Sequence, residues 1–274
     1  MRTSEGAGGK GILNSDRTAG QFSLARYMPS PDLDWLIKRF WVVRWDLRGK
    51  PPYRQIVLSH PNVNMVFECG NTRIYGVNRT SETRIVQGEG RVLGIKFQPG
   101  GFYPFWKQDI AGLAGKSVSL EEAFGQEANA LETAVLAQPD DEGMIRLAEQ
   151  FFRARMPERD EGVEEASRIV RTIENDRHIA KVDDLADRFS IGKRTLQRLF
   201  SRYVGISPKW VIQRYRLHEA AEQAERGEQP DWVKLSMDMG YYDQAHFIKD
   251  FKAIIGKTPE EHRLQKVPHG LGDD

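Results

Sequence analysis

A doubled segment near the C-terminus constrains the fold of this chain more than any other feature. Residues 198–208 and residues 249–259 carry a basic residue, a phenylalanine, a glycine and a Ser/Thr-Pro pair at identical spacing, 51 positions apart. Upstream, Leu185-Ala186 matches Leu235-Ser236 at a separation of 50 positions. The repetition predicts that one structural unit occurs twice.

Each copy has the pattern of a helix-turn-helix. A short helix, a tight turn, a second helix, a glycine break and a new helix beginning at Ser/Thr-Pro follow one another in both copies. A helix-turn-helix places its second helix in the major groove of DNA. Two copies therefore predict that a single protomer reads two successive major grooves of double-stranded DNA.

The formal net charge of +1 hides an uneven distribution of charge. Between Arg188 and His218 the chain has eight basic residues and no acid, and acids flank this stretch on both sides. Such a stretch is an electrostatic footprint for polyanions. We expect it to face nucleic acid.

The composition, 39% hydrophobic and 29% charged residues, is typical of a soluble globular protein. No apolar run approaches the roughly 20 residues that span a bilayer, so we expect no membrane partner and a cytoplasmic location. Residues 1–20 are polar and Gly-rich and are expected to be disordered. The single cysteine, Cys69, excludes an internal disulfide framework and is expected to pack in a strand.

The N-terminal half is predicted to be mainly β. Strand-like runs occur at residues 55–58, 64–68, 73–77, 84–87 and 92–97. Turn residues separate them at 60–62, 70–71, 88–90 and 99–101. This alternation predicts a small β-barrel or sandwich. One amphipathic helix, residues 31–40, is expected before it, from apolar residues at helical spacing: Leu33, Leu36, Ile37 and Phe40.

After Gly115 the apolar period becomes helical. Ser119 and Glu122 form a capping-box pattern. Helices are predicted at 119–124, 129–137, 141–156, 163–175, 182–188, 193–203, 208–226, 232–239, 243–254 and after Thr258. A charged break with Pro and Gly at its ends, residues 157–162, marks the boundary between domains. We expect a disordered N-terminus (1–20), a β-barrel sensor domain (21–117), a helical dimerisation or linker region (118–160), a DNA-binding domain (161–266) and a flexible tail (267–274).

Helical geometry predicts which side chains face DNA. Leu196, Leu199 and Phe200 recur at core spacing. On the opposite face, Arg and Lys suit guanine, and Gln suits adenine. The predicted base-reading residues are Lys193, Arg194, Gln197, Arg198, Gln244, His246 and Lys249. The predicted phosphate contacts are Arg202, Lys209, Arg214 and Lys252.

The helix between the two copies predicts their separation. About 18 residues at a rise of 1.5 Å give roughly 27 Å. Successive major grooves are about 34 Å apart. The shortfall predicts that bound DNA bends.

Residues from about 163 to 266 resemble the DNA-binding domain of AraC/XylS-type transcription regulators. The second copy carries the family pattern as Gly240-Tyr241, Phe247, Lys249, Phe251-Lys252, Gly256, Pro259 and His262-Arg263. His262 departs from the usual aromatic residue and is expected at the edge of the core. Lys249 replaces the commoner Arg, which changes a bidentate contact to a point charge.

The resemblance implies a cupin-like N-terminal barrel that binds an effector or partner, and adjacent helices that form a homodimer. RNA polymerase is a further implied partner. Residues 94–105 also resemble a signature of one subgroup of these regulators, although Pro99-Gly100-Gly101 also suits a turn and Phe102, Phe105 and Trp106 suit a core. We therefore expect an α+β multidomain transcription regulator: a cupin-like β-barrel with flanking helices, followed by an all-α domain with two helix-turn-helix units.

Three alternatives differ in function. The barrel could serve only for dimerisation of a ligand-independent DNA-binding protein. A cupin-type enzyme would need a metal site, and the N-terminal half has one histidine, His60. A DNA-repair regulator with a thiolate zinc site would need more than one cysteine. We expect no catalytic residues, no metal and no cofactor.

Overall fold

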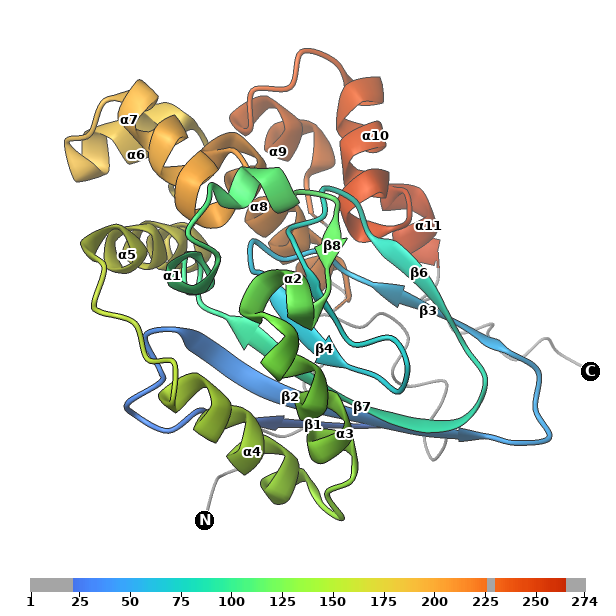
Figure 1. Ribbon diagram of the computed structural model, residues 1–274. Coiled ribbons are helices and arrows are strands. Elements are labelled where there is room, and N and C mark those ends of the chain that lie inside the picture. Colours follow the sequence, from blue (N-terminus) through green and yellow to red (C-terminus); the bar gives the residue numbers. More distant parts are fainter. Residues whose placement is uncertain (1–21, 226–229, 265–274) are drawn as a thin grey trace, which may run out of the picture.

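The computed structural model describes residues 22–225 and 230–264, so the predictions for residues 1–20 and 267–274 lie outside the described residues. The N-terminal part is rich in strands and the C-terminal part is helical (Figure 1). The strands are β1 (Phe22–Tyr27), β2 (Ile37–Leu47), β3 (Tyr53–Val57), β4 (Asn64–Phe67), β5 (Arg73–Tyr75), β6 (Glu82–Val86), β7 (Gly88–Phe97) and β8 (Ser117–Val118). The α+β division predicted from the sequence is confirmed.

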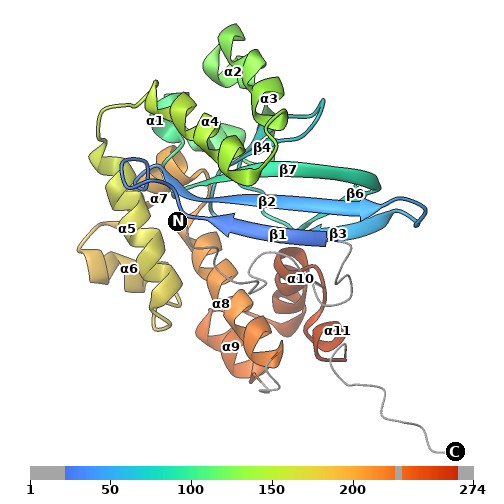
Figure 2. The same ribbon diagram turned by 90° about the horizontal axis from the view of Figure 1, so that it is seen from below.

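The strands form two antiparallel sheets. One has six strands in the order β1-β2-β7-β4-β5-β8, and the other pairs β3 with β6. The two longest strands, β2 and β7, pair in the interior of the larger sheet. Figure 2 shows α3 and α4 on one side of this sheet and α8–α11 on the other.

Two glycines allow β7 to pair closely with β2. Gly90 and Gly94 lie opposite Trp45 and Trp41. A Cβ on Gly94 would lie 1.8 Å from a ring atom of Trp41, and one on Gly90 would lie 2.4 Å from a ring atom of Trp45. The turn predicted at residues 88–90 is therefore wrong, because these residues begin β7 and Gly90 makes room for the indole ring of Trp45.

The helix predicted at residues 31–40 is also wrong. Residues 31–36 form consecutive turns, and β2 begins at Ile37. The pairing register of β2 with β7 shifts between Ile37 and Arg39, as at a β-bulge. Because of this shift Ile37 and Phe40, three positions apart, are both fully buried. Their spacing resembles that of a helix although the backbone is extended.

Short helices follow the sheet: α1 (Tyr103–Trp106), α2 (Leu120–Phe124), α3 (Asn129–Leu136) and α4 (Asp141–Arg153). The predicted capping box is confirmed at the start of α2, since Ser119 N donates to Glu122 Oε2 at 2.6 Å and Glu122 N donates to Ser119 Oγ at 3.1 Å. Helix α4 packs its phenylalanines on the sheet, with Phe152 edge-on to Phe97 at 5.5 Å between ring centroids. Phe102 is 1% exposed and belongs to the same core, as predicted.

The C-terminal part consists of α5 (Glu161–Asn175), α6 (Val182–Phe189), α7 (Lys193–Leu199), a π-helical turn (Phe200–Val204), α8 (Pro208–Glu225), α9 (Trp232–Asp238), α10 (Gln244–Ile255) and α11 (Pro259–Leu264). Helix α8 joins two separate cores. Its first half contributes Val211 and Ile212 to the core around α5–α7, and its second half contributes Leu217 and Ala221 to the core around α9–α10. The helix is thus a shared support for two packed units.

Candidate nucleic-acid interface

The turn between α6 and α7 has the geometry of a helix-turn-helix. Ser190 ends α6 in the left-handed region with φ of 52°. Ile191 N then donates to the carbonyl of Ala186 at 3.0 Å. This six-residue closure satisfies a carbonyl at the end of α6 and redirects the chain into α7.

The turn between α9 and α10 repeats this geometry 50 positions later. Gly240 has φ of 72°, and Tyr241 N donates to the carbonyl of Ser236 at 2.9 Å. Beyond the turn, equivalent residues of the two units are 51 positions apart in the sequence. Gly205 and Gly256 end the two units with φ of 87° and 88°. The internal repeat of the sequence is therefore a repeat of backbone conformation.

In the first unit, α7 (Figure 1) buries one face and exposes the other. Leu196 and Phe200 are fully buried, and Leu199 is partly buried. The four predicted base-reading residues of this helix are all exposed: Lys193, Arg194, Gln197 and Arg198. Lys193 forms an ion pair with Asp183 of α6. The structure thus places these side chains together on one solvent-facing surface.

The second unit has the same division. Phe247 and Phe251 are buried, whereas Gln244, His246 and Lys249 are exposed. Asp243 is the N-cap of α10, because His246 N donates to Asp243 Oδ1 at 2.8 Å. The His246 ring lies edge-on to Tyr241, at 5.3 Å between centroids, and its Nε2 lies 3.6 Å from Asp250 Oδ2.

The predicted phosphate-contacting residues have different environments. Lys209 and Lys252 are exposed. Arg202 is also exposed, but its Nε donates to the Tyr103 hydroxyl of the N-terminal domain at 2.7 Å. Its guanidinium also lies over the Tyr203 ring, 5.6 Å from the centroid.

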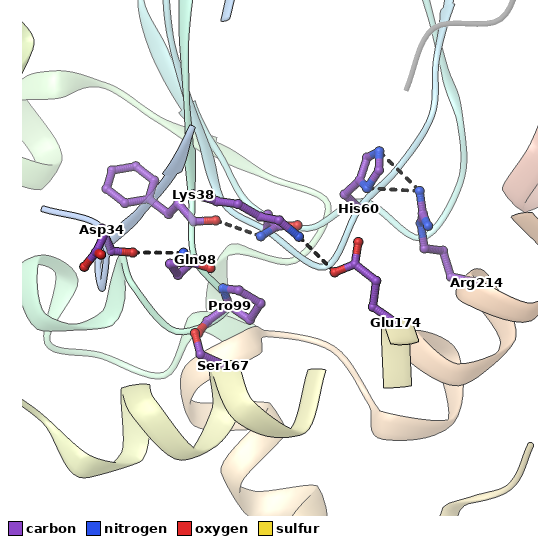
Figure 3. A network of polar contacts seen from close by, with 10 residues as sticks. Asp34, Lys38, His60, Gln98, Pro99, Ser167, Glu174 and Arg214 are labelled. Atoms are coloured by element: carbon purple, nitrogen blue, oxygen red, sulfur yellow. Dashed lines mark hydrogen bonds and ion pairs between the residues drawn. The ribbon is translucent and has the colours of Figure 1, made fainter. Parts of the chain in front are cut away.

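The prediction that Arg214 contacts the phosphate backbone is wrong for this structure. Arg214 is 3% exposed and points from α8 into the N-terminal domain (Figure 3). Its Nε donates to the Ser59 carbonyl at 2.7 Å, and its Nη2 lies 3.0 Å from His60 Nδ1. Burial lowers the pKa of Arg214 to about 10. The sequence pattern correctly indicated a basic helix but could not indicate that a distant segment covers this side chain.

Further polar contacts join the domains around Arg214. Lys38 Nζ donates to Glu174 Oε2 at 2.9 Å, and Ser167 Oγ donates to the Pro99 carbonyl at 2.9 Å (Figure 3). Arg216 is 5% exposed and donates to the Ile173 carbonyl. Two of the eight basic residues in the acid-free stretch, Arg214 and Arg216, therefore face the interior, and the others are exposed.

Both units contact the N-terminal domain through the glycine that follows the second helix. A Cβ on Gly205 would lie 2.7 Å from Ile110 Cγ2. A Cβ on Gly256 would lie 3.2 Å from Ile56 Cγ2 and 3.3 Å from Ser81 Oγ. Ser81 N also donates to the Ala253 carbonyl of α10 at 2.8 Å. Gly205 and Gly256, which are equivalent positions of the repeat, thus contact different parts of the N-terminal domain.

A shallow hollow of about 450 Å³ lies beside the first unit. It is lined by Arg168, Arg171, Thr172, Asn175, Asp176 and Arg188. Arg168 is held by Glu165, with Nε to Oε2 at 2.9 Å, and lies over Phe189. Arg168 and Arg171 were not among the predicted DNA contacts, although their spacing of three positions on one helix could have indicated a shared face.

Other features of the described residues bear on alternative functions. Across residues 22–225 and 230–264, no three or more His, Cys, Asp or Glu side chains are grouped to hold a metal ion. No helix in these ranges is long and apolar enough to cross a membrane. Cys69 is exposed after β4, so the prediction that it packs in a strand is wrong.

Two parts of the chain match family models. Residues 185–265 match the family model of a helix-turn-helix domain. Residues 25–119 match a domain of unknown function (DUF6597).

Curated relatives match part of the chain. The virulence regulon transcriptional activator VirF of Yersinia enterocolitica is 31% identical over 88 residues, 32% of each chain. The transcriptional activator RhaS of Pectobacterium carotovorum is 31% identical over 81 residues, 30% of this chain and 29% of RhaS. The chain thus matches about a third of the length of these curated relatives.

Two solved structures show weaker likeness. ToxT from Vibrio cholerae aligns over 90% of this chain and 98% of its own, with 12% identity and a TM-score of 0.35. The C-terminal domain of AraT from Geobacillus stearothermophilus aligns over 39% of this chain and 88% of its own, with 20% identity and a TM-score of 0.31.

Proposed function

Since residues 185–265 form a helix-turn-helix domain of the AraC type, we propose that this chain is a sequence-specific, DNA-binding transcription regulator. The observation that carries the proposal is the repeated unit itself. Each copy has a second helix with one buried apolar face and one exposed polar face, and such a helix suits the major groove.

The connecting helix supports engagement of two successive grooves. Helix α8 has 18 residues, which corresponds to a length of about 27 Å. The two units pack on opposite halves of this helix, so the helix sets their separation. Grooves about 34 Å apart would then be reached by bending the DNA.

We assign the side chains to two roles. Lys193, Arg194, Gln197, Arg198, Gln244, His246 and Lys249 read bases. Lys209, Lys252 and Arg202 position the phosphate backbone, and Arg168, Arg171 and Arg188 add positive charge beside the first unit. Arg214 is excluded from the second group because it is buried in the domain interface.

The N-terminal domain regulates DNA binding in this account. It contacts both units, through Ile110 at Gly205 and through Ile56 and Ser81 at Gly256. A small-molecule effector or a partner protein that shifts this domain would therefore change the position of both units together. The names of VirF and RhaS support activation of transcription. Contact with RNA polymerase and homodimerisation through residues 118–160 stay predictions.

Selection from a pool of random duplexes tests the proposal. The full-length protein at near-physiological salt should enrich a motif with two short fixed blocks about one helical turn apart. The double variant Arg198→Ala/Lys249→Ala, changed only at exposed positions, is the matched control and should lose the enrichment. Enrichment that appears only when cell extract is added would identify a need for an effector. No enrichment under either condition would contradict the proposed function.

A further inference from the structure

The two turns of the repeat differ by one residue, Tyr242. As far as Ile191 and Tyr241, which donate the matching hydrogen bonds, equivalent residues of the two units are 50 positions apart in the sequence. It is 51 positions from the N-caps onward, at Gly192 and Asp243. Tyr242 is therefore the residue by which the second turn is longer, and it directly precedes the N-cap of α10.

Tyr242 does not contribute to packing. Its side chain is 98% exposed, and it has no ring contact or hydrogen bond among the described residues. The preceding Tyr241 has the opposite environment: its ring lies 5.4 Å from Phe247, and its hydroxyl accepts from Gln213 Nε2 at 3.0 Å. An inserted aromatic residue that stabilises nothing in the fold is available for an external contact.

Tyr242 lies at the N-terminal end of α10, which is the end of the second helix that would meet base edges. In a helix-turn-helix, N-terminal residues of the second helix contact bases in the major groove. At this end α10 (Figure 1) exposes Gln244 and the methyl group of Ala245 beside Tyr242 in sequence. The same end of α7 exposes Lys193 and Arg194 instead. The two units thus offer different chemistry to DNA.

This difference predicts different base preferences. Arg and Lys donate to guanine O6 and N7, whereas apolar groups contact the C5-methyl group of thymine and Gln pairs with adenine. We propose that Tyr242 is a specificity-determining residue that contacts a thymine methyl group, so that α10 reads an A·T-rich block while α7 reads a guanine-containing block. The inference rests on the proposed function, since it assigns a base class to the same interface.

Replacement of thymine by deoxyuridine tests the contact, because it removes only the methyl group. The full-length protein is measured against a selected duplex in which each thymine of the α10 block is replaced in turn. That block is identified as the one whose preferences change in Lys249→Ala. Loss of one buried methyl contact should weaken wild-type binding about fourfold at one position.

Variants of Tyr242 assign the contact to its ring. Tyr242→Ala should bind thymine and deoxyuridine duplexes equally, whereas Tyr242→Phe should keep the discrimination because the ring remains. Met237→Ala, which removes another exposed apolar side chain from the neighbouring helix α9, should also keep it. The thermal midpoint of each variant checks that the fold is retained.

Two results would overturn the inference while leaving the proposed function intact. One is specific binding in which no thymine of the α10 block responds to deoxyuridine. The other is a deoxyuridine penalty that persists in Tyr242→Ala. If no duplex is enriched at all, the proposed function and this inference fail together.

Discussion

Arg214 Nε donates a hydrogen bond to the main-chain carbonyl of Ser59, 155 positions away in the sequence, at 2.7 Å. The bond connects the middle of α8 to the N-terminal domain. Nη2 of the same guanidinium faces His60. Because α8 supports both helix-turn-helix units, this arginine links the proposed sensor domain to the part of the structure that sets the spacing of the recognition helices.

Replacement of Arg214 should therefore lower stability and leave phosphate contacts unchanged. Hydrogen bonds to charged groups contribute about 1.5–3 kcal/mol each, so Arg214→Ala should lower the free energy of unfolding by at least about 2 kcal/mol. Chemical denaturation measures this change. Lys209→Ala, on the same helix but exposed, should change it by less than about 0.5 kcal/mol. A stable Arg214→Ala protein with a weaker salt dependence of DNA binding would contradict the burial of this side chain.

Arg198→Ala tests base reading by the first unit. The side chain is exposed on the second turn of α7, so the fold should not change. Loss of a bidentate contact to guanine should cost about 1–3 kcal/mol and relax the preference at one base pair. Binding of a set of duplexes with single base changes measures both effects. A uniform loss across all duplexes would mean that this face of α7 meets phosphates.

Lys209→Ala tests the positioning of the phosphate backbone. Lys209 lies at the start of α8, exposed. Its removal should weaken binding to all sequences about equally and reduce the slope of log K against log salt by about 1. Titrations at several salt concentrations measure the slope. An unchanged slope would place Lys209 away from the DNA.

The domain interface contains two histidines that burial keeps neutral. The pKa of His60 is well below its usual value because of burial and the nearby charges of Arg214, Lys96 and Lys38. The pKa of His218 is lowered in the same way, by burial and then by Arg214 and Lys96. Nε2 of His218 is buried without a hydrogen-bond partner in the described part of the chain.

Stability should consequently fall on mild acidification. In the unfolded chain both imidazoles have a pKa of about 6.5, so below about pH 6.5 the unfolded state binds more protons than the folded state. The free energy of unfolding should drop by about 1.4 kcal/mol for each histidine between about pH 7.5 and about pH 5.5. Urea denaturation across this range measures the drop. His60→Gln should reduce this drop in the free energy of unfolding, and replacement of the exposed His178 by Gln should leave the drop unchanged. The same drop in the wild type and in both variants would contradict this explanation.

The helical half could be predicted from the sequence because its signals are local. Thr258 and Glu261 form a capping box at the start of the helix predicted after Thr258, and Thr258 N donates to Glu261 Oε2 at 2.7 Å. Asp243 caps α10, and the left-handed residues Gly205 and Gly256 end the repeats. Each signal depends on residues within a few positions, so it is visible without knowledge of the tertiary fold.

The remaining features depend on distant contacts. The bulge between Ile37 and Arg39 changes which side chains of β2 face the core, and this made an extended segment resemble a helix. Gly90, which was predicted in a turn, lies in β7 opposite Trp45, whose ring fills the space beside it. Arg214 has a charged side chain on a basic helix, and only the packed domains show that it faces inward.

Missing-nucleoside interference tests whether one chain reads two successive major grooves. A selected duplex carrying random single-nucleoside gaps is bound by the full-length protein, and the gaps that weaken binding are mapped. We expect two blocks of sensitive bases with centres about 10–10.5 base pairs apart. Lys249→Ala should remove the sensitivity at one position of the block assigned to α10, and Arg198→Ala should remove it at one position of the block assigned to α7. A single block, unaffected by Lys249→Ala, would contradict the account.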